Sequence, residues 1–345
     1  MRKMELQILH ALAESKKTFW QLLDQNHYLL KNFIETLESL YDKGLIAVDK
    51  EGIYLTQKGK EEIIPSHLEF KSMICGKCQG KRIIFDGKFN EILEEYKKIV
   101  QKRPSPTVSF FQGYMYEYDV VARVAVMHHY GDLLNNAFLL VGDDDLLSVA
   151  LALTELPSRI VVLDIDERLG EFLNRVNKEY GFEIEFLKFD VSEPLPEEFM
   201  GKFDVFSSEP LETLSGLQAF LSRGVCCLKR NGVGYFGLTT IEASLKKWFS
   251  IEEMLVKMGC VITDVIRGFS VYPMDYGNIS YETFAAKLKL PVGENKGVNW
   301  YKSALFRFEV MSTIEKRKKW NKKIKVEYMD PEEDVTYPTF EKSKL

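Results

Sequence analysis

The feature that most constrains the fold is a regular alternation of short apolar runs and helical repeats between residues 105 and 312. This alternation predicts a mostly parallel β-sheet with helices on both faces, because parallel strands are joined by crossover helices. The expected strands are Phe138–Val141, Arg159–Leu163, Ile184–Phe189, Phe203–Phe206, Val225–Lys229, Gly232–Leu238, Val261–Ile266 and Leu305–Met311. The expected helices are Leu146–Leu156, Leu169–Tyr180, Leu214–Ser222 and Leu245–Met258. Such sheets bind ligands beyond the carboxyl ends of their strands.

Residues 1–64 predict three helices followed by a β-hairpin, a pattern typical of a winged-helix-like domain. Domains of this kind often insert their third helix into DNA. Here that helix carries Glu35, Glu38 and Asp42 against Lys31 and Lys43. Surplus carboxylates repel phosphates, so DNA binding is disfavoured. We interpret the domain as a dimerisation or substrate-covering module.

Residues 65–104 form a connector that contains the sequence Cys75-Gly76-Lys77-Cys78. Zinc in proteins usually has four ligands, and the sequence contains no second pair of cysteines at this spacing. We therefore expect two ordinary thiols and no bound metal; the alternative is a structural metal that takes further ligands from a second chain or from elsewhere in the fold. Residues 313–345 begin basic and become acidic, which predicts a flexible, charged tail.

The charge and the cysteine content exclude several classes of protein. The chain has 345 residues and a net charge of −5, which disfavours general nucleic-acid binding and is compatible with a cationic small molecule. Five scattered cysteines favour a reducing compartment, and no uncharged apolar run reaches the length of a membrane span. We expect a cytoplasmic homodimer with neither nucleic acid nor a membrane as its partner.

Three consecutive carboxylates, Asp143, Asp144 and Asp145, follow Gly142 at the end of the first strand. Nucleotide-binding folds usually place a glycine-rich loop here, so that backbone N–H groups approach an anion. One aspartate at this position would serve as a helix cap, but a single cap does not account for three. The loop favours ammonium and sulfonium groups, and it disfavours S-adenosylmethionine because it would repel that donor's carboxylate.

Three further carboxylates are expected at the ends of later strands. Asp164 lies 22 residues after Gly142, at the distance where an acidic residue contacts ribose hydroxyls in this architecture. Asp190 ends the third strand, where it is placed to accept the adenine amino group. Glu209 leaves the fourth strand, where a carboxylate is placed to hold an amine and accept its proton during attack.

The segment Gly232-Val233-Gly234-Tyr235-Phe236-Gly237 matches the dinucleotide-binding pattern GxGxxG in letters only. It continues as an apolar strand, and no helix begins at its third glycine. A dinucleotide site needs a strand before the glycines and a helix after them. We therefore interpret the segment as a turn and a late core strand.

Together, Gly142–Asp145, the strand end at Asp164, the Ser207–Pro210 segment and the winged-helix-like leader resemble the branched-chain polyamine synthases, or N(4)-bis(aminopropyl)spermidine synthases. The resemblance spans most of the chain, and the triple aspartate is its most specific part. It implies an α/β, class I methyltransferase-like Rossmann fold, similar to that of spermidine synthases. It also implies transfer of aminopropyl groups from decarboxylated S-adenosylmethionine to the secondary amine of spermidine, with release of methylthioadenosine, in thermophiles.

The likeness to spermidine synthases implies roles for individual residues. Their Gly-Gly-Gly-Asp-Gly loop matches Gly142–Leu146, so their donor-binding aspartate corresponds to Asp145, and their catalytic aspartate corresponds to Glu209. The region in which they contact donor and amine corresponds to Gln112, Tyr114, Tyr116 and Asp119. This sequence departs from their pattern at Asp143 and Asp144 and by the exchange of aspartate for glutamate, which favours a more acidic acceptor site.

The reaction that the resemblance implies is mainly a problem of positioning, because the donor sulfonium already makes the adjacent methylene electrophilic. We assign Asp145 and Glu209 to the reacting amine, with Asp143 as an alternative to Asp145, and Asp143 and Asp144 to ammonium recognition. The donor is a co-substrate, no cofactor is expected, and its expected ligands are Gly142, Gln112, Asp144, Asp164 and Asp190. Crowded carboxylates raise one another's pKa, so cation binding should weaken as the pH falls.

Three alternatives stay open at this point. An S-adenosylmethionine-dependent methyltransferase would bind a donor that keeps its carboxylate. A linear spermidine or spermine synthase would differ only in its product. A winged-helix regulator that senses polyamines would bind DNA in a salt-dependent way.

Overall fold

The N-terminal part of the molecule is a small helical domain closed by a β-hairpin. The computed structural model describes residues 3–69 and 72–336. The domain's elements are α1 (Lys3–Glu14), α2 (Phe19–Asp24), α3 (Leu30–Asp42), β1 (Ile46–Asp49), β2 (Gly52–Leu55) and α4 (Gln57–Glu61). Its helices pack through fully buried side chains such as Leu9, Leu23 and Phe33. The three helices and the hairpin are where the sequence predicts them, and the winged-helix assignment stays a prediction.

The larger part of the chain, here called the sheet domain, is built on one seven-stranded sheet in the order β5-β4-β3-β6-β7-β9-β8. Its strands are β3 (Ala137–Val141), β4 (Arg159–Asp164), β5 (Ile184–Lys188), β6 (Phe203–Ser208), β7 (Leu228–Thr239), β8 (Cys260–Val271) and β9 (Lys302–Val310). The five strands from β5 to β7 are parallel, and β9 and β8 continue the sheet in antiparallel pairing. The chain order reverses between β3 and β6, which places the ligand crevice at their carboxyl ends. The predicted class I methyltransferase-like fold is confirmed.

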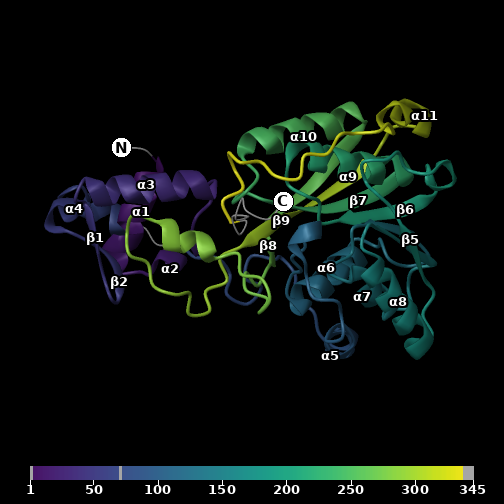
Figure 1. The fold of residues 1–345 in the computed structure, drawn as a ribbon, viewed down its shortest axis with the longest axis horizontal. Helices are drawn as coiled ribbons and strands as arrows, with labels where there is room; N and C mark the ends of the chain where they lie inside the picture. The colour runs from purple at the N-terminus through teal and green to yellow at the C-terminus, as the bar shows by residue number, and fades with distance from the viewer. Residues whose placement is uncertain (1–2, 70–71, 337–345) are drawn as a thin grey trace.

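Helices cover both faces of this sheet (Figure 1). They are α5 (Lys88–Val100), α6 (Glu117–His129), α7 (Leu147–Ala152), α8 (Glu167–Tyr180), α9 (Leu214–Cys227) and α10 (Leu245–Lys257). The predicted strand Val225–Lys229 is wrong over its first half. Val225, Cys226 and Cys227 end α9, and they are fully buried. A short apolar run that is buried on all sides has the same sequence pattern in a strand and in a helix.

Helix α5, which lies within the predicted connector, packs against α6 and α7 of the sheet domain. Its buried face includes Ile92, Leu93 and Tyr96, and the Tyr96 hydroxyl donates to the backbone carbonyl of Asp145. The rest of the connector includes a short 3-10 helix at Pro65–Glu69. Within the described residues, the structure contains no helix long and apolar enough to cross a membrane.

The flexible tail that the sequence predicts spans residues 313–345, of which 337–345 lie outside the described residues. After α11 (Ile314–Arg317), the segment 313–336 passes back across the sheet domain beside α10 (Figure 1). The fully buried Arg317 donates to the Leu228 carbonyl at 2.8 Å. Lys247 of α10 pairs with Asp330 at 3.0 Å and with Glu333 at 3.1 Å. Charged residues that suggested a solvated tail, such as Asp330 and Glu333, therefore form ion pairs that hold the segment to the domain.

The N-terminal domain is docked on the sheet domain through aromatic packing and through the start of α3. Trp20 contacts Phe284 and Trp300, with ring centroids 6.0 and 5.8 Å apart. The Leu30 N–H donates to the Ile241 carbonyl at 3.0 Å, and Lys31 pairs with Glu332 at 2.9 Å. The first turn of α3 therefore faces the sheet domain of the same chain.

Candidate active site

A cavity of about 340 Å³ opens at the carboxyl ends of β3, β4 and β6, where the topology predicts a ligand. One end is bounded by Gly142, Asp144, Asp164 and Asp190, which the sequence predicts at strand ends. The other end is bounded by residues from the loops that follow β6, β7 and β8 and from the C-terminal segment. These include Glu209, Glu212, Glu242, Tyr272, Tyr276, Tyr301, Tyr328, Asp334 and Thr336.

The three aspartates after Gly142 point in three different directions. Gly142 has a φ of 76°, in the left-handed region that glycine adopts readily, and this turns the chain sharply at the end of β3. The Asp143 carboxylate accepts hydrogen bonds from the N–H and the hydroxyl of Ser148, at 3.2 and 2.5 Å. It is buried against the first turn of α7, outside the cavity lining, and burial raises the pKa of Asp143 well above its ordinary value.

Asp144 and Asp145 hold the segment 112–115 beside the cavity. The Gly113 N–H donates to the Asp144 carboxylate at 3.1 Å, and the Met115 N–H donates to the Asp145 carboxylate at 2.6 Å. Asp144 lines the cavity, and Asp145 is buried behind that lining. Burial raises the pKa of both carboxyls, and the charges of Asp144 and Glu209 raise that of Asp145 further. The structure thus brings the predicted carboxylates of Asp144, Asp145 and Glu209 close to one another.

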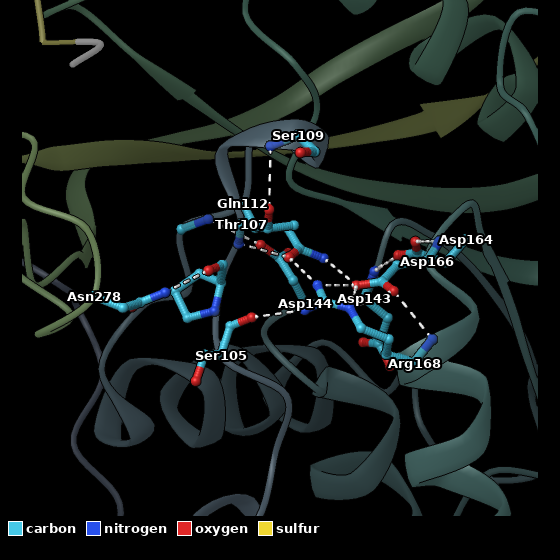
Figure 2. Close-up of polar contacts among 12 residues, drawn as sticks. Ser105, Thr107, Ser109, Gln112, Asp143, Asp144, Asp164, Asp166, Arg168 and Asn278 are labelled. Carbon is cyan, nitrogen blue, oxygen red and sulfur yellow. Dashed lines mark hydrogen bonds and ion pairs between the residues drawn. The ribbon is translucent and has the colours of Figure 1, made fainter. Parts of the chain in front are cut away.

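Figure 2 shows the polar contacts around Gln112, at the same end of the cavity as Asp144 and Asp164. The Gln112 amide donates to the Asp166 carboxylate at 2.9 Å, and its oxygen accepts from the Thr107 N–H at 3.1 Å. Asp164 accepts from the N–H groups of Asp143 and Asp166, at 3.0 and 2.8 Å. Burial raises the pKa of Asp164 to about 6. Asp166, which the sequence reasoning missed, therefore links Gln112 to the end of β4.

Asp190 lies beyond β5 and also lines the cavity, where its carboxylate accepts from the Ser192 N–H at 2.8 Å. Apolar side chains complete this end of the cavity: Phe110, Phe111, Ile165, Phe189 and Phe220. A flat apolar slot with carboxylates at two edges suits an adenosine, whose ring stacks and whose hydroxyl and amino groups donate.

Glu209 sits at the junction of the two ends, directly after β6. Its carboxylate accepts hydrogen bonds from the Arg123 guanidinium and from the Tyr272 hydroxyl. Arg123 is almost fully buried and also donates to the Ser270 hydroxyl at 3.0 Å. The charge of Glu209 offsets the buried guanidinium and helps to raise the pKa of Arg123.

Two further carboxylates, Glu212 and Glu242, extend the acidic lining and were missed by the sequence reasoning. Glu212 accepts from the N–H and the hydroxyl of Thr239, and burial raises its pKa from 4.5 to about 8. Glu242 accepts from the Tyr301 hydroxyl at 2.7 Å and from Thr336 of the C-terminal segment. Within the described residues, neither carboxylate makes an ion pair with lysine or arginine. Both are therefore carboxyl groups without a cationic partner in the described part of the chain, and burial raises the pKa of each.

The C-terminal segment contributes one wall of the cavity. Tyr328 stacks on Phe111 with ring centroids 5.8 Å apart and an interplanar angle of 14°. The Thr213 hydroxyl donates to the Glu327 carbonyl at 2.6 Å. No local sequence motif predicts these contacts, because they join residues more than 100 positions apart in the sequence.

Three predicted substrate residues lie outside this cavity. The Tyr114 ring packs on the Arg103 guanidinium at 3.9 Å, and its carbonyl accepts from Tyr276. Tyr116 donates to the Asn299 amide oxygen at 2.9 Å, and Asp119 pairs with the buried Lys81 at 3.1 Å. Tyr116 and Asp119 border a second hollow beside the connector, so the structure does not bring them to the acidic lining.

The cysteine pair of the connector stands apart from the cavity. Cys75 is exposed, and hydrogen bonds from the N–H groups of Cys78 and Lys77 lower the pKa of its thiol. Among the described residues, no group of three or more histidines, cysteines or carboxylates is arranged to hold a metal ion. The absence of a bound metal at Cys75 and Cys78 stays a prediction.

Comparison with known proteins gives one consistent result. Residues 91–336 match the family model described as the branched-chain polyamine synthase A C-terminal domain. The chain is 41% identical to the N(4)-bis(aminopropyl)spermidine synthase of Thermococcus kodakarensis, over 92% of this chain and 90% of the relative. It is 37% identical to that of Methanocaldococcus jannaschii, over 85% of this chain and 83% of the relative.

A solved structure agrees with these sequence relatives. The branched-chain polyamine synthase of Thermus thermophilus, in complex with N4-aminopropylspermidine and 5'-methylthioadenosine, superposes with a TM-score of 0.80. The two chains are 33% identical, and the match covers 97% of this chain and 93% of the other. The resemblance inferred from Gly142–Asp145, Asp164, the Ser207–Pro210 segment and the leader is thus confirmed over most of the chain, and the chain belongs to the branched-chain polyamine synthase family.

Proposed function

We propose that this chain transfers aminopropyl groups from decarboxylated S-adenosylmethionine to the secondary amine of spermidine. The products are a branched polyamine and methylthioadenosine. The single observation that carries the proposal is the cavity, which joins an apolar slot of nucleoside size to a lining of carboxylates. The solved relative in complex with N4-aminopropylspermidine and 5'-methylthioadenosine supports the same pairing of ligands. The chain is an aminopropyltransferase of the alkyl-transferring class, and the donor is a co-substrate.

The donor fits the end of the cavity around Asp164 and Asp190. Asp164 is placed to accept from the ribose hydroxyls and Asp190 from the adenine amino group, with Gln112 and Gly142 closing the slot. The Asp144 carboxylate faces the junction, where the donor's aminopropyl ammonium would lie. These assignments predict a preference for a decarboxylated donor, because the carboxylate of S-adenosylmethionine would meet Asp144.

The acceptor fits the end that contains Glu209, Glu212 and Glu242. The secondary amine attacks the methylene next to sulfur, the C–S bond breaks with its electron pair moving to sulfur, and the amine proton passes to a carboxylate. Glu209 and Asp145 stay the proposed residues for this proton, and Asp143 positions the loop through Ser148. Glu212 and Glu242 hold the flanking ammonium groups, since charge-assisted hydrogen bonds are the strong ones.

One experiment tests the proposal directly. The protein is incubated with spermidine and either decarboxylated S-adenosylmethionine or S-adenosylmethionine, and products are identified by mass spectrometry and fragmentation. We expect methylthioadenosine and products branched at the secondary nitrogen from the decarboxylated donor alone. Linear products would support a spermidine or spermine synthase instead, and methylated products would support a methyltransferase.

The remaining expectations are part of the same proposal. Homodimer formation is tested by light scattering coupled to size-exclusion chromatography, and a cytoplasmic location by cell fractionation. The regulator alternative is weakened by the docking of α3, whose Leu30 and Lys31 contact the sheet domain. Salt-dependent binding to duplex DNA would revive it.

A further inference from the structure

The three glycines of the segment 232–237 have no role in holding a nucleotide, because all three lie within the central strand β7. A side chain at Gly234 would overlap the ring of Phe308 in the core. A side chain at Gly237 would meet a different neighbour. Its first carbon would overlap the carboxyl carbon and both carboxylate oxygens of Glu209. The missing side chain at Gly237 is therefore the space that the Glu209 carboxylate occupies.

The Glu209 carboxylate is enclosed on its other sides by hydrogen-bond donors. Arg123 of α6 and Tyr272, just after β8, both donate to it, and both donors are buried. Arg123 is anchored in turn by the Ser270 hydroxyl at 3.0 Å. The Glu209 carboxylate is thus held in one position by the donors Arg123 and Tyr272 and by the space left at Gly237.

We propose that Gly237 is a positioning residue that fixes the Glu209 carboxylate against strand β7, within reach of Arg123 and Tyr272. The inference rests on the proposed function, in which Glu209 acts on the attacking amine. A methyl group at Gly237 leaves the carboxylate one direction in which to move, which is into the cavity. There it would lose its two donors and approach Asp144, another anion.

The same geometry accounts for a glutamate at a position that the spermidine synthase pattern fills with aspartate. A glutamate side chain is one methylene longer than aspartate, so its carboxylate reaches back over the neighbouring strand. That reach requires the neighbouring strand to be bare at Gly237, which pairs with Leu305 on its other side. Glu209 and Gly237 therefore form a matched pair.

The test compares Gly237→Ala with Gly234→Ala in the full-length protein. We expect Gly237→Ala to lower kcat about 100-fold, the loss typical of a displacement of about 1 Å at a reacting group, with the KM for the decarboxylated donor unchanged. Gly234→Ala adds the same methyl group to the same strand, where its nearest neighbours are atoms of the Phe308 ring, so its kcat should stay at the wild-type value below its melting temperature. A kcat of Gly237→Ala within twofold of wild type would overturn the inference.

A rescue experiment separates positioning from general damage to β7. Shortening the acid with Glu209→Asp makes room for the added methyl group, so the double variant should lose less activity than the product of the two single losses. Losses that simply multiply would contradict the matched pair, because independent sites behave in that way.

A stability cycle keeps the inference testable if Gly237→Ala folds poorly. We expect the drop in Tm caused by Gly237→Ala to disappear in a Glu209→Ala background, where no carboxylate remains to collide. An equal drop in both backgrounds would assign the damage to the strand itself and reject the inference. Glu209→Gln distinguishes this failure from that of the proposed function. If Glu209→Gln keeps full activity, the role of Glu209 is wrong, whatever Gly237 does.

Discussion

The two ends of the cavity differ in how they are built. At the donor end, the carboxylates of Asp144, Asp164 and Asp190 follow three parallel strands directly, so one rule of sheet topology brings them together. At the acceptor end, Glu212 and Glu242 come from separate loops, and a segment more than 90 residues further along the chain covers them. The difference teaches that the donor end is a property of the fold, and the acceptor end is an addition to it.

The largest effect is expected where the two ends meet. Glu209→Gln removes the proton acceptor while keeping the shape of the side chain, and we expect kcat to fall about 1000-fold, within the range typical of general bases. Release of methylthioadenosine at saturating substrates measures this loss. The matched control is Asp204→Asn on the same strand, whose carboxylate pairs with Lys229 outside the cavity. Equal losses in both variants would mean that β6, and not the carboxylate, is responsible.

A donor-end variant should affect one substrate only. Asp144→Asn removes the charge that faces the donor's ammonium, and we expect the KM for decarboxylated S-adenosylmethionine to rise about 30-fold, as for a lost charged hydrogen bond. Methylthioadenosine has no aminopropyl group, so its affinity, measured by calorimetry, should stay the same. A parallel loss of methylthioadenosine affinity would move Asp144 from ammonium binding to the nucleoside slot.

The sequence predicts the donor end well because each of its residues is local to a strand end. Gly142, Asp164 and Asp190 needed only the strand boundaries, and the structure places all three at the cavity. The triple aspartate was harder, because the sequence cannot show that Asp143 turns onto Ser148 while Asp144 lines the cavity. Side-chain direction in a tight loop depends on a backbone angle such as the φ of 57° at Leu146.

The acceptor end escaped prediction for a physical reason. Glu242 follows β7 without a recognisable motif, and its partners Tyr301 and Thr336 are 59 and 94 positions away. The charged segment 313–336 has the composition of a solvated tail, and its burial depends on pairs such as Lys247 with Asp330. Long-range pairing of this kind leaves no periodic signal in one sequence.

At the acceptor end, pH should control binding through Glu212. Its pKa of about 8 means that the empty protein holds this carboxyl protonated at neutral pH. A flanking ammonium group binds the ionised form of Glu212. The KM for spermidine should therefore fall as the pH rises from 6 to 9, a range in which the primary amines that flank the secondary amine stay charged. At pH 9, Glu212→Gln should raise this KM about tenfold and flatten its pH dependence. An unchanged pH profile in the variant would assign the effect to another carboxyl.

A smaller effect is expected from the contacts that hold the C-terminal segment. Lys247→Met removes the pairs with Asp330 and Glu333, so Thr336 should release Glu242 more often. We expect the KM for spermidine to rise about fivefold, which corresponds to roughly 1 kcal/mol, with little change for the donor. Hydrogen exchange of residues 326–336 should speed up in parallel. The exposed neighbour Lys246→Met is the control, and an equal effect there would point to charge alone.

The smallest effect concerns the stability of the empty protein, and its sign follows from linkage. Because folding raises the pKa of Glu212 from 4.5 to about 8, its folded form holds the proton more tightly than the unfolded form. The resulting stabilisation is complete below pH 4.5 and is lost as the pH rises through 8. Glu212→Gln keeps a neutral group at every pH, so it should raise the Tm by about 2–4 °C at pH 9 and change it little at pH 5. Saturating spermidine should reverse the order at pH 9, because only the carboxylate binds the ammonium. If Glu212→Gln were less stable than wild type at pH 9 without ligand, the ionised Glu212 carboxylate would not destabilise the empty protein, and this prediction would be wrong.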